Sequence, residues 1–341
     1  MTNNTDILNE LFQHDLTPQI EGDLIAMLNE WHSLPEVWDN ELDAQIHRWY
    51  SNPPKVFPKR PYFSPSSVTS CPRELYLKDK RAKRDEVKRQ PHQGRWTRIG
   101  TAIGDVIQRD LLFIEKHYER QTGKPPKFRL LRTKNGEPAF EDFVKINRTI
   151  EHNGETFNLY GTCDGILEYE TDSGDKIRVG LEIKSKQTTP ARTSLYSMKE
   201  AEESHVAQTV AYSIMYGVDY YVVLYVNAAK QSWNLTDEQA TKTPDIRAFC
   251  RKIDDKERTE LLDTLAEQTR RQRTGDKPPL DLSKWTFNNY KEACANDLTD
   301  DEYDEIKTTV KRVEASRLKD WQKRQYTEAL AFIDNVRGRQ E

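Results

Sequence analysis

The segment Ile177-Arg-Val-Gly-Leu-Glu-Ile-Lys184 gives the clearest indication of the fold class. Its apolar side chains stand at every second position, which is the period of a β-strand with one buried face. The residues between them point to the opposite face. Glu182 and Lys184 therefore project together, two positions apart, from a strand whose other side is apolar.

The segments around this strand predict an α/β core. Residues 156–162, 163–169 and 176–184 are strand-like, and the turn residues of Asp172-Ser-Gly-Asp175 separate the last two. Residues 194–217 have a helical pattern, and the apolar run 220–226 that follows predicts a buried strand. A β-hairpin, a crossing helix and a further strand together form an α/β core.

Three consecutive regions are predicted along the chain. Residues 1–60 form an acidic helical extension, with apolar residues at helical spacing around 7–12 and 24–31, and a Pro-rich connector. Residues 61–235 form the core. Residues 236–341 are charged and helical from about residue 240 and pack back on the core.

Within these regions three helices have recognisable signals. Ser66 or Ser67 is expected to cap a short helix over residues 71–77, and Thr299, followed three residues later by Glu302, predicts a capped helix near the C-terminus. A long helix is expected over about residues 98 to 120. Its expected buried stripe consists of Ile99, Ile103, Val106, Ile107, Leu111 and Ile114.

Composition excludes several classes of protein. The longest apolar run, residues 220–226, is far shorter than the roughly 20 residues that a membrane helix requires. The first residues show neither the basic nor the apolar region of a signal peptide. Four cysteines are too few for a disulfide scaffold. We expect a cytoplasmic protein with no membrane partner.

The net charge of −4 hides a strong asymmetry. Residues 1–50 hold ten acidic side chains and one basic one, whereas residues 51–98 hold thirteen Lys or Arg against four acids. A basic working face beside an acidic region is one interpretation, and two unrelated solvated surfaces are the other.

The hairpin carries the candidate chemistry. Asp164 lies between small residues in Gly161-Thr-Cys-Asp-Gly165, across the predicted hairpin from Glu182. Two carboxylates that converge on a strand pair can hold a divalent cation such as Mg²⁺. The Lys184 ammonium group can then orient a water or stabilise charge on a phosphate. The alternative is a solvated cross-strand ion pair, which is common on exposed sheets.

The helix that follows adds a second polar group. His205, Gln208 and Tyr212 lie on one stripe of the segment, at i, i+3 and i+7. Such a stripe, facing two acids, can position a phosphate or a base. An ordinary half-buried amphipathic helix would show the same pattern.

Taken in order, these motifs resemble those of the PD-(D/E)XK nucleases, and more narrowly the RecB-like exonucleases, including CRISPR-associated and phage recombination members. The motifs are Ser66-x-x-x-x-Cys-Pro-Arg-x-x-Tyr76, Gly100-x-x-x-Gly104, Gly-Thr-Cys-Asp164-Gly, Glu182-Ile-Lys184 and Gln208-x-x-x-Tyr212. The resemblance implies a restriction-endonuclease-like core, a mixed central sheet flanked by helices, with helical extensions at both ends.

The resemblance also implies roles for the site residues. Asp164, Glu182 and the carbonyl of Ile183 would bind Mg²⁺ or Mn²⁺, and Lys184 would act on the attacking water. Gln208 and Tyr212 would support the site and contact DNA. The expected activity is metal-dependent hydrolysis of DNA phosphodiester bonds by an exonuclease, in recombination, repair or phage DNA processing, with a recombination or annealing protein as a further partner.

Two departures from the family pattern stand out. Gly104 occupies the position where many RecB-like members carry a His or Glu ligand, so Asp105 or Gln108 is expected to substitute. Cluster-bearing relatives use four cysteines, but this chain keeps Cys71 and Cys294 and has Trp285 and Asn288 at the middle positions. Two thiolates cannot hold a four-iron cluster, so no iron–sulfur cluster is expected.

The remnant of that cluster site predicts that Cys71 and Cys294 lie near each other, held by packing of Trp285, Phe287 and Tyr290. The alternative is that Cys294 is merely a small buried residue.

The remaining basic and aromatic residues are expected to contact DNA. Arg73, Lys78, Lys80, Arg81, Lys83 and Arg84 can line a channel for phosphates. His92 and Trp96 can stack on unpaired bases. Two other functions remain open: a structure-specific endonuclease of the same fold, and a catalytically silent DNA- or protein-binding module. The acidic first fifty residues are interpreted as an accessory cap or a partner-binding segment.

Overall fold

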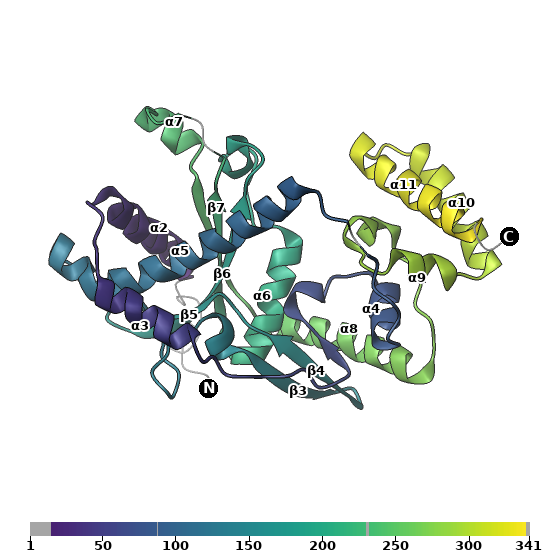
Figure 1. Cartoon of the computed structure of the whole chain (residues 1–341), viewed down its shortest axis with the longest axis horizontal. Coiled ribbons are helices and arrows are strands. Elements are labelled where there is room, and N and C mark those ends of the chain that lie inside the picture. Colours follow the sequence, from purple (N-terminus) through teal and green to yellow (C-terminus); the bar gives the residue numbers. More distant parts are fainter. Residues whose placement is uncertain (1–14, 87, 230–231, 339–341) are drawn as a thin grey trace, which may run out of the picture. The chain divides into compact units, whose positions relative to one another are not determined.

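The computed structural model describes residues 15–86, 88–229 and 232–338 (Figure 1). It divides into two compact units, each assembled from separated stretches of chain, whereas the sequence predicts three consecutive regions. The first unit takes the chain up to Phe57, Pro91–Ile146 and Gly161–Arg258. The second takes Pro58–Gln90, Asn147–Tyr160 and the chain from Thr259 onward.

A five-stranded mixed sheet is the centre of the first unit. Its strands, in spatial order, are β2 (Phe128–Leu130), β5 (Gly165–Glu170), β6 (Lys176–Lys186), β7 (Tyr220–Asn227) and β8 (Ile246–Lys252). Neighbouring strands are antiparallel except β6 and β7, which run parallel. A parallel pair needs a crossover connection, and α6 (Glu203–Tyr216) lies in the chain between them.

The predicted hairpin and the apolar strand are confirmed. β5 and β6 pair antiparallel, and Gly174, with φ +84°, takes the left-handed conformation in the turn between them. β7 coincides with the predicted buried strand. The predicted strand at residues 156–162 exists as β4 (Glu155–Gly161), but it belongs to the second unit's sheet.

β8 contradicts the expectation that the chain is wholly helical from about residue 240. It completes the sheet beside β7, with Ile246, Ala248 and Cys250 buried and Arg247 and Arg251 half-exposed. The alternation of a half-buried strand is therefore present in the sequence. The high charge of the surrounding residues masks it.

Helices pack on this sheet. They are α2 (Thr17–Ser33), α5 (Pro91–Thr122) and α6. α3 (Asn40–Tyr50) packs against the same apolar core, whereas α7 (Asp237–Lys242) is exposed along its whole length. In Figure 1, α5 runs diagonally across the strands, and it contacts β2 and β6. The short 3₁₀ turns of this unit are η2 (Glu141–Val144) and η3 (Pro190–Thr193).

Two helix predictions need correction. α5 begins at Pro91, earlier than predicted, and its buried stripe includes Ile107, Leu111 and Ile114, whereas Ile99 and Val106 are exposed. The stripe is broken because the first part of the helix has one side open to solvent. The helix predicted over residues 194–217 is shorter in the structure, because α6 begins only at Glu203.

The acidic N-terminal region is an integral part of the first unit. Ile20, Leu24 and Leu28 of α2 are fully buried in the same core as the sheet. Asp39 accepts from Lys116 at 2.5 Å, and Asp43 pairs with Arg109 at 2.8 Å. The acids of this region thus neutralise bases on α5. The predicted apolar helix around residues 7–12 lies outside the described residues.

The second unit combines a small sheet with helices. Its strands are ordered β1 (Tyr62–Phe63), β4 and β3 (Ile146–His152). Its helices are α4 (Pro72–Asp79), most of α8 (Asp255–Thr274), α9 (Lys291–Asn296), α10 (Asp300–Glu314) and α11 (Asp320–Arg337), with 3₁₀ turns η1 (Pro65–Ser67) and η4 (Leu282–Phe287). Among the described residues, no helix has both the length and the apolar composition that crossing a membrane requires.

The cap predicted by Thr299 is confirmed: its side chain accepts from the amide of Glu302, and the Glu302 side chain accepts from the amide of Thr299. The predicted serine caps are wrong. Ser66 and Ser67 lie in the separate turn η1, and Cys71 directly precedes α4.

Cys71 and Cys294 lie near each other in the second unit, as predicted. Both are free and fully buried. Burial raises the pKa of Cys294 to about 12, and the charge of Cys71 adds to the rise. Asn288 donates to Cys294 Sγ at 3.5 Å, and the apolar packing includes Trp285 and Tyr290. Phe287 is 87% exposed, so its predicted part in this packing is wrong.

Candidate active site

The β5–β6 hairpin brings the two predicted carboxylates together. Asp164 directly precedes β5, and its Oδ2 accepts a hydrogen bond from the amide of Ile183, 2.6 Å away on β6. Glu182 and Lys184 flank Ile183 and point to the same side of the strand. The three charged groups therefore gather at one end of the hairpin.

Lys184 is held from two sides. Its Nζ lies 2.5 Å from Glu182 Oε1 and donates to Gln208 Oε1 at 2.9 Å. The amide group of Gln208 then donates to the Tyr212 hydroxyl at 2.9 Å. A lysine ammonium group only donates, so the oxygen of the amide must face it and the nitrogen must face the tyrosine. α6 thus fixes the position of the ammonium group.

His205, on the same stripe of α6, is directed elsewhere: its Nδ1 lies 2.8 Å from the Tyr225 hydroxyl. The structure brings Asp164, Glu182, Lys184 and Gln208 into one connected group, with Tyr212 behind it.

Burial shapes the charges of the site. Glu182 is only 2% exposed, and burial raises its pKa, although Lys184 opposes the rise. Burial and the charge of Glu182 raise the pKa of Asp164 to about 8, against the amide of Ile183 and the charge of Lys184, which lower it. Glu182 is therefore buried, unlike the acid of a solvated cross-strand ion pair.

A third carboxylate, Glu141, was not predicted. It lies in η2 with φ +47°, in the left-handed region that residues other than glycine seldom adopt. Its amide donates to the Cys163 carbonyl at 3.1 Å, which fixes it beside the start of β5. Burial, and then the charge of Asp164, raise the pKa of Glu141 to about 7. No motif or spacing marks this residue among the 56 acidic ones in the sequence.

Gln108 links Glu141 to Asp164. Its amide nitrogen donates to the Asp164 carbonyl at 2.8 Å and lies 3.4 Å from Glu141 Oε1. It is 1% exposed, and its Oε1 has no hydrogen-bond partner among the described residues. Asp105 is exposed, and its charge raises the pKa of Glu141. Of the two predicted substitutes at this position, Gln108 is the one with hydrogen bonds to the site.

The donor set fits a magnesium-type cation. Among residues 15–86, 88–229 and 232–338, no three His, Cys, Asp or Glu gather closely enough to form a protein-only metal cage. Mg²⁺, however, usually keeps several waters and needs only one or two carboxylates. Glu182 Oε2 is buried and has no partner in the described part of the chain, which leaves an acceptor that a cation would satisfy.

The basic block predicted to line a DNA channel lies in the second unit. Arg73 does not fit that role: it is fully buried, donates to the Pro278 carbonyl at 2.6 Å and pairs with Asp297 and Glu302. It is a structural residue of this unit. Lys83 and Arg84 line a cavity of about 780 Å³ together with the acids Asp85, Glu86 and Glu292, and Lys83 pairs with Glu86 at 2.8 Å.

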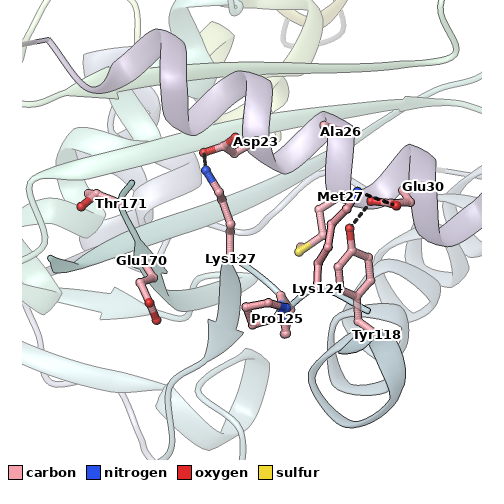
Figure 2. Close-up of a pocket in the computed structure, with 11 residues that line it drawn as sticks. Asp23, Ala26, Met27, Glu30, Tyr118, Lys124, Pro125, Lys127, Glu170 and Thr171 are labelled. Carbon is pink, nitrogen blue, oxygen red and sulfur yellow. Dashed lines mark hydrogen bonds and ion pairs between the residues drawn. The ribbon is translucent and has the colours of Figure 1, made fainter. Parts of the chain in front are cut away.

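A cavity of about 380 Å³ in the first unit is unrelated to the candidate active site (Figure 2). It lies between α2 and the end of α5. Its cations are already paired: Lys127 with Asp23 at 2.9 Å, and Lys124 with Glu30 at 3.2 Å. Figure 2 shows both lysines turned towards α2. None of the predicted site residues lines it.

Comparison with known protein families found no match, and no curated protein matches the chain. Among solved structures it is similar to a protein called SSO0001, with 13% identity and a TM-score of 0.39, over 76% of this chain and 95% of that one. It is also similar to an alkaline exonuclease, LHK-Exo, from Laribacter hongkongensis, with 13% identity and a TM-score of 0.33, over 62% and 90% of the two chains. LHK-Exo in complex with dAMP matches with 14% identity and a TM-score of 0.33, over 62% and 88%. Similarity at this level does not assign the chain to a family.

Proposed function

We propose that this protein is a metal-dependent deoxyribonuclease of the PD-(D/E)XK type that hydrolyses DNA phosphodiester bonds, acting from DNA ends in the manner of RecB-like exonucleases. The observation that carries the proposal is the Lys184 ammonium group, fixed between Glu182 and Gln208 beside the Asp164 carboxylate. A buried acid, Glu182, a half-buried acid, Asp164, and a positioned cation at one end of a hairpin suit hydrolysis of a phosphate ester.

Asp164, Glu182 and the Ile183 carbonyl would hold Mg²⁺ or Mn²⁺, with Glu141 and Gln108 beside them. A bound cation supplies Lewis acidity and lowers the pKa of a coordinated water. Lys184 donates a hydrogen bond to the attacking water or to a phosphate oxygen. Its positive charge stabilises the negative charge that develops on the phosphate during the reaction. Gln208 keeps the ammonium group in place, and Tyr212 keeps the amide of Gln208 oriented.

The order of elements supports the same assignment. A helix, α5, precedes the β5–β6 hairpin that bears the acids, and α6 then crosses to the parallel strand β7. The resemblance of the sequence motifs to the PD-(D/E)XK nucleases follows this same order. We further propose that DNA is the partner of this protein and that it acts in recombination, repair or phage DNA processing.

Degradation of end-labelled linear DNA and closed circular DNA tests this function. The purified protein is incubated with Mg²⁺, Mn²⁺ or EDTA, beside Asp164→Ala. An exonuclease shortens linear DNA from its ends and leaves the circle intact, only with a cation and only in the wild type. Cleavage of the circle would favour a structure-specific endonuclease. DNA binding without any cleavage would indicate a silent binding module.

A further inference from the structure

The first half of α5 carries an exposed apolar stripe. Trp96, Ile99 and Val106 expose 50%, 44% and 55% of their surface. Together with His92 and Ile103 they recur at intervals of three and four residues, which places them along one side of the helix. Soluble proteins seldom leave such a stripe open without a binding role.

Charge identifies the kind of partner. The first fourteen residues of α5, 91–104, contain Arg95 and Arg98 and no acidic residue. Both arginines are exposed, and neither has an ion-pair partner among the described residues. The N-terminal end of a helix adds a partial positive charge. From His92 to Ile103 the stripe is edged by positive charge alone on its own helix, and the first acid, Asp105, comes beside Val106 at its far end. An apolar stripe with positive charge along most of its length suits an anionic partner with flat apolar groups, which describes unpaired nucleic acid.

The stripe is joined directly to the active-site strand. Gln187 Nε2, three residues beyond Lys184, donates to the Trp96 carbonyl at 3.0 Å. A Cβ on Gly100 would lie 3.0 Å from Ser185 Oγ, so glycine permits the helix to approach the end of β6 this closely. The first half of α5 therefore lies beside the end of β6 that carries Lys184.

Trp96 is held by one ring contact and still offers open surface. The rings of His92 and Trp96 form a T-shaped pair with centroids 5.2 Å apart, and half of the surface of Trp96 remains exposed. A held but exposed indole can stack on an unpaired base, whereas the bases inside a duplex cover each other's faces.

We propose that the first half of α5 is a docking surface for the single-stranded end of a DNA substrate. Trp96 stacks on an unpaired base, and Arg95 and Arg98 bind the backbone phosphates. The surface directs the end of the DNA strand towards Lys184. This part of the proposal rests on the nuclease function proposed above.

Binding of fluorescein-labelled oligo(dT), measured by anisotropy in EDTA and low salt, tests the surface without hydrolysis. Trp96→Ala is expected to weaken binding about tenfold, the effect of losing one base–aromatic stack, whereas Trp96→Phe retains most of it. Trp38→Ala is the matched control, because Trp38 is 74% exposed in the same unit and lies outside the stripe. A double Arg95→Gln, Arg98→Gln variant is expected to reduce the salt slope by about 1.4.

Three results would overturn the proposal. The first is an affinity for oligo(dT) that is the same in Trp96→Ala and wild type. The second is a loss of affinity for a blunt duplex in Trp96→Ala that is as large as the loss for oligo(dT). The third is a change of molar mass in Trp96→Ala by light scattering, which would make a second copy the occupant. Because binding is measured in EDTA, a failure of hydrolysis with intact Trp96-dependent binding refutes only the nuclease function.

Discussion

Asp164→Asn is predicted to stabilise the metal-free protein while destroying its response to metal. The carboxylate of Asp164 is held close to Glu182, and burial together with that neighbour raises its pKa from 3.8 to about 8. An asparagine keeps an oxygen to accept from the Ile183 amide and removes the negative charge. The perturbation therefore isolates the electrostatic cost of assembling the site.

The sign and size of the effect follow from linkage. Because the folded-state pKa of Asp164 lies above the unfolded value, the stability it contributes is full below about pH 4 and is lost as the pH rises through about 8. Each tenfold change in proton affinity is worth about 1.4 kcal/mol, so the loss at pH 8 has a ceiling of about 6 kcal/mol. Glu182 stays in the same pocket, so we expect a gain on the order of 2 kcal/mol for the variant at pH 8.

Urea unfolding in EDTA at pH 5 and pH 8 measures this gain. Asp237→Asn, at an exposed position in the first unit, is the matched control and should differ from wild type by less than about 0.5 kcal/mol. Adding Mg²⁺ at about 100 times its dissociation constant should stabilise the wild type by about 2.7 kcal/mol and leave Asp164→Asn unchanged. A variant no more stable than wild type at pH 8 would show that the charge of Asp164 carries no such cost. Equal stabilisation of both proteins by Mg²⁺ would show that Asp164 does not bind the cation.

Two further substitutions test the hydrogen bond that positions Lys184 and the packing of the sheet behind the site. Gln208→Ala removes the acceptor of the hydrogen bond from Lys184 and should lower the cleavage rate at saturating DNA by about tenfold or more. DNA binding in EDTA should stay unchanged. An unchanged cleavage rate would show that the ammonium group does not need this hydrogen bond. Gly180→Ala would place a Cβ 1.9 Å from the buried ring of Tyr221 and should cost about 3 kcal/mol in urea unfolding. Its control, Gly22→Ala in α2, meets no described atom within 4 Å and should gain about 0.5–1 kcal/mol, so equal effects of the two would contradict the packing.

The hairpin and its acids were predictable because their signals are local. Alternation alone assigns Glu182 and Lys184 to one face of β6, and turn residues mark the end of β5. The partners of Lys184 were predictable from helical spacing, which put Gln208 and Tyr212 on one stripe of α6.

Glu141 was not predictable, because its place depends on the fold of distant segments. It reaches Asp164 through a backbone hydrogen bond to Cys163 and a left-handed residue conformation, and neither leaves a pattern in the sequence. Arg73 was misassigned for a related reason. Its type and neighbours suggest a phosphate contact, whereas burial among Asp297 and Glu302 makes it structural.

The charge asymmetry had a local explanation that composition could not reveal. Asp23, Asp39 and Asp43 of the acidic region pair with bases that come from α5 or follow it. Such pairing depends on α2 and α3 packing in the first unit, which only the fold determines. The net charge of the chain therefore says little about its partner.

A comparison of two lysines of one strand tests whether Lys184 acts on the phosphate ester. Lys186 points to the same side of β6 two residues further on, where it pairs with Glu202. The initial rate of cleavage of end-labelled DNA is measured with Mg²⁺ for the wild type, Lys184→Gln and Lys186→Gln. We predict a loss of at least about 100-fold for Lys184→Gln and less than about threefold for Lys186→Gln. Equal rates for Lys184→Gln and wild type would show that Lys184 does not act on the phosphate ester.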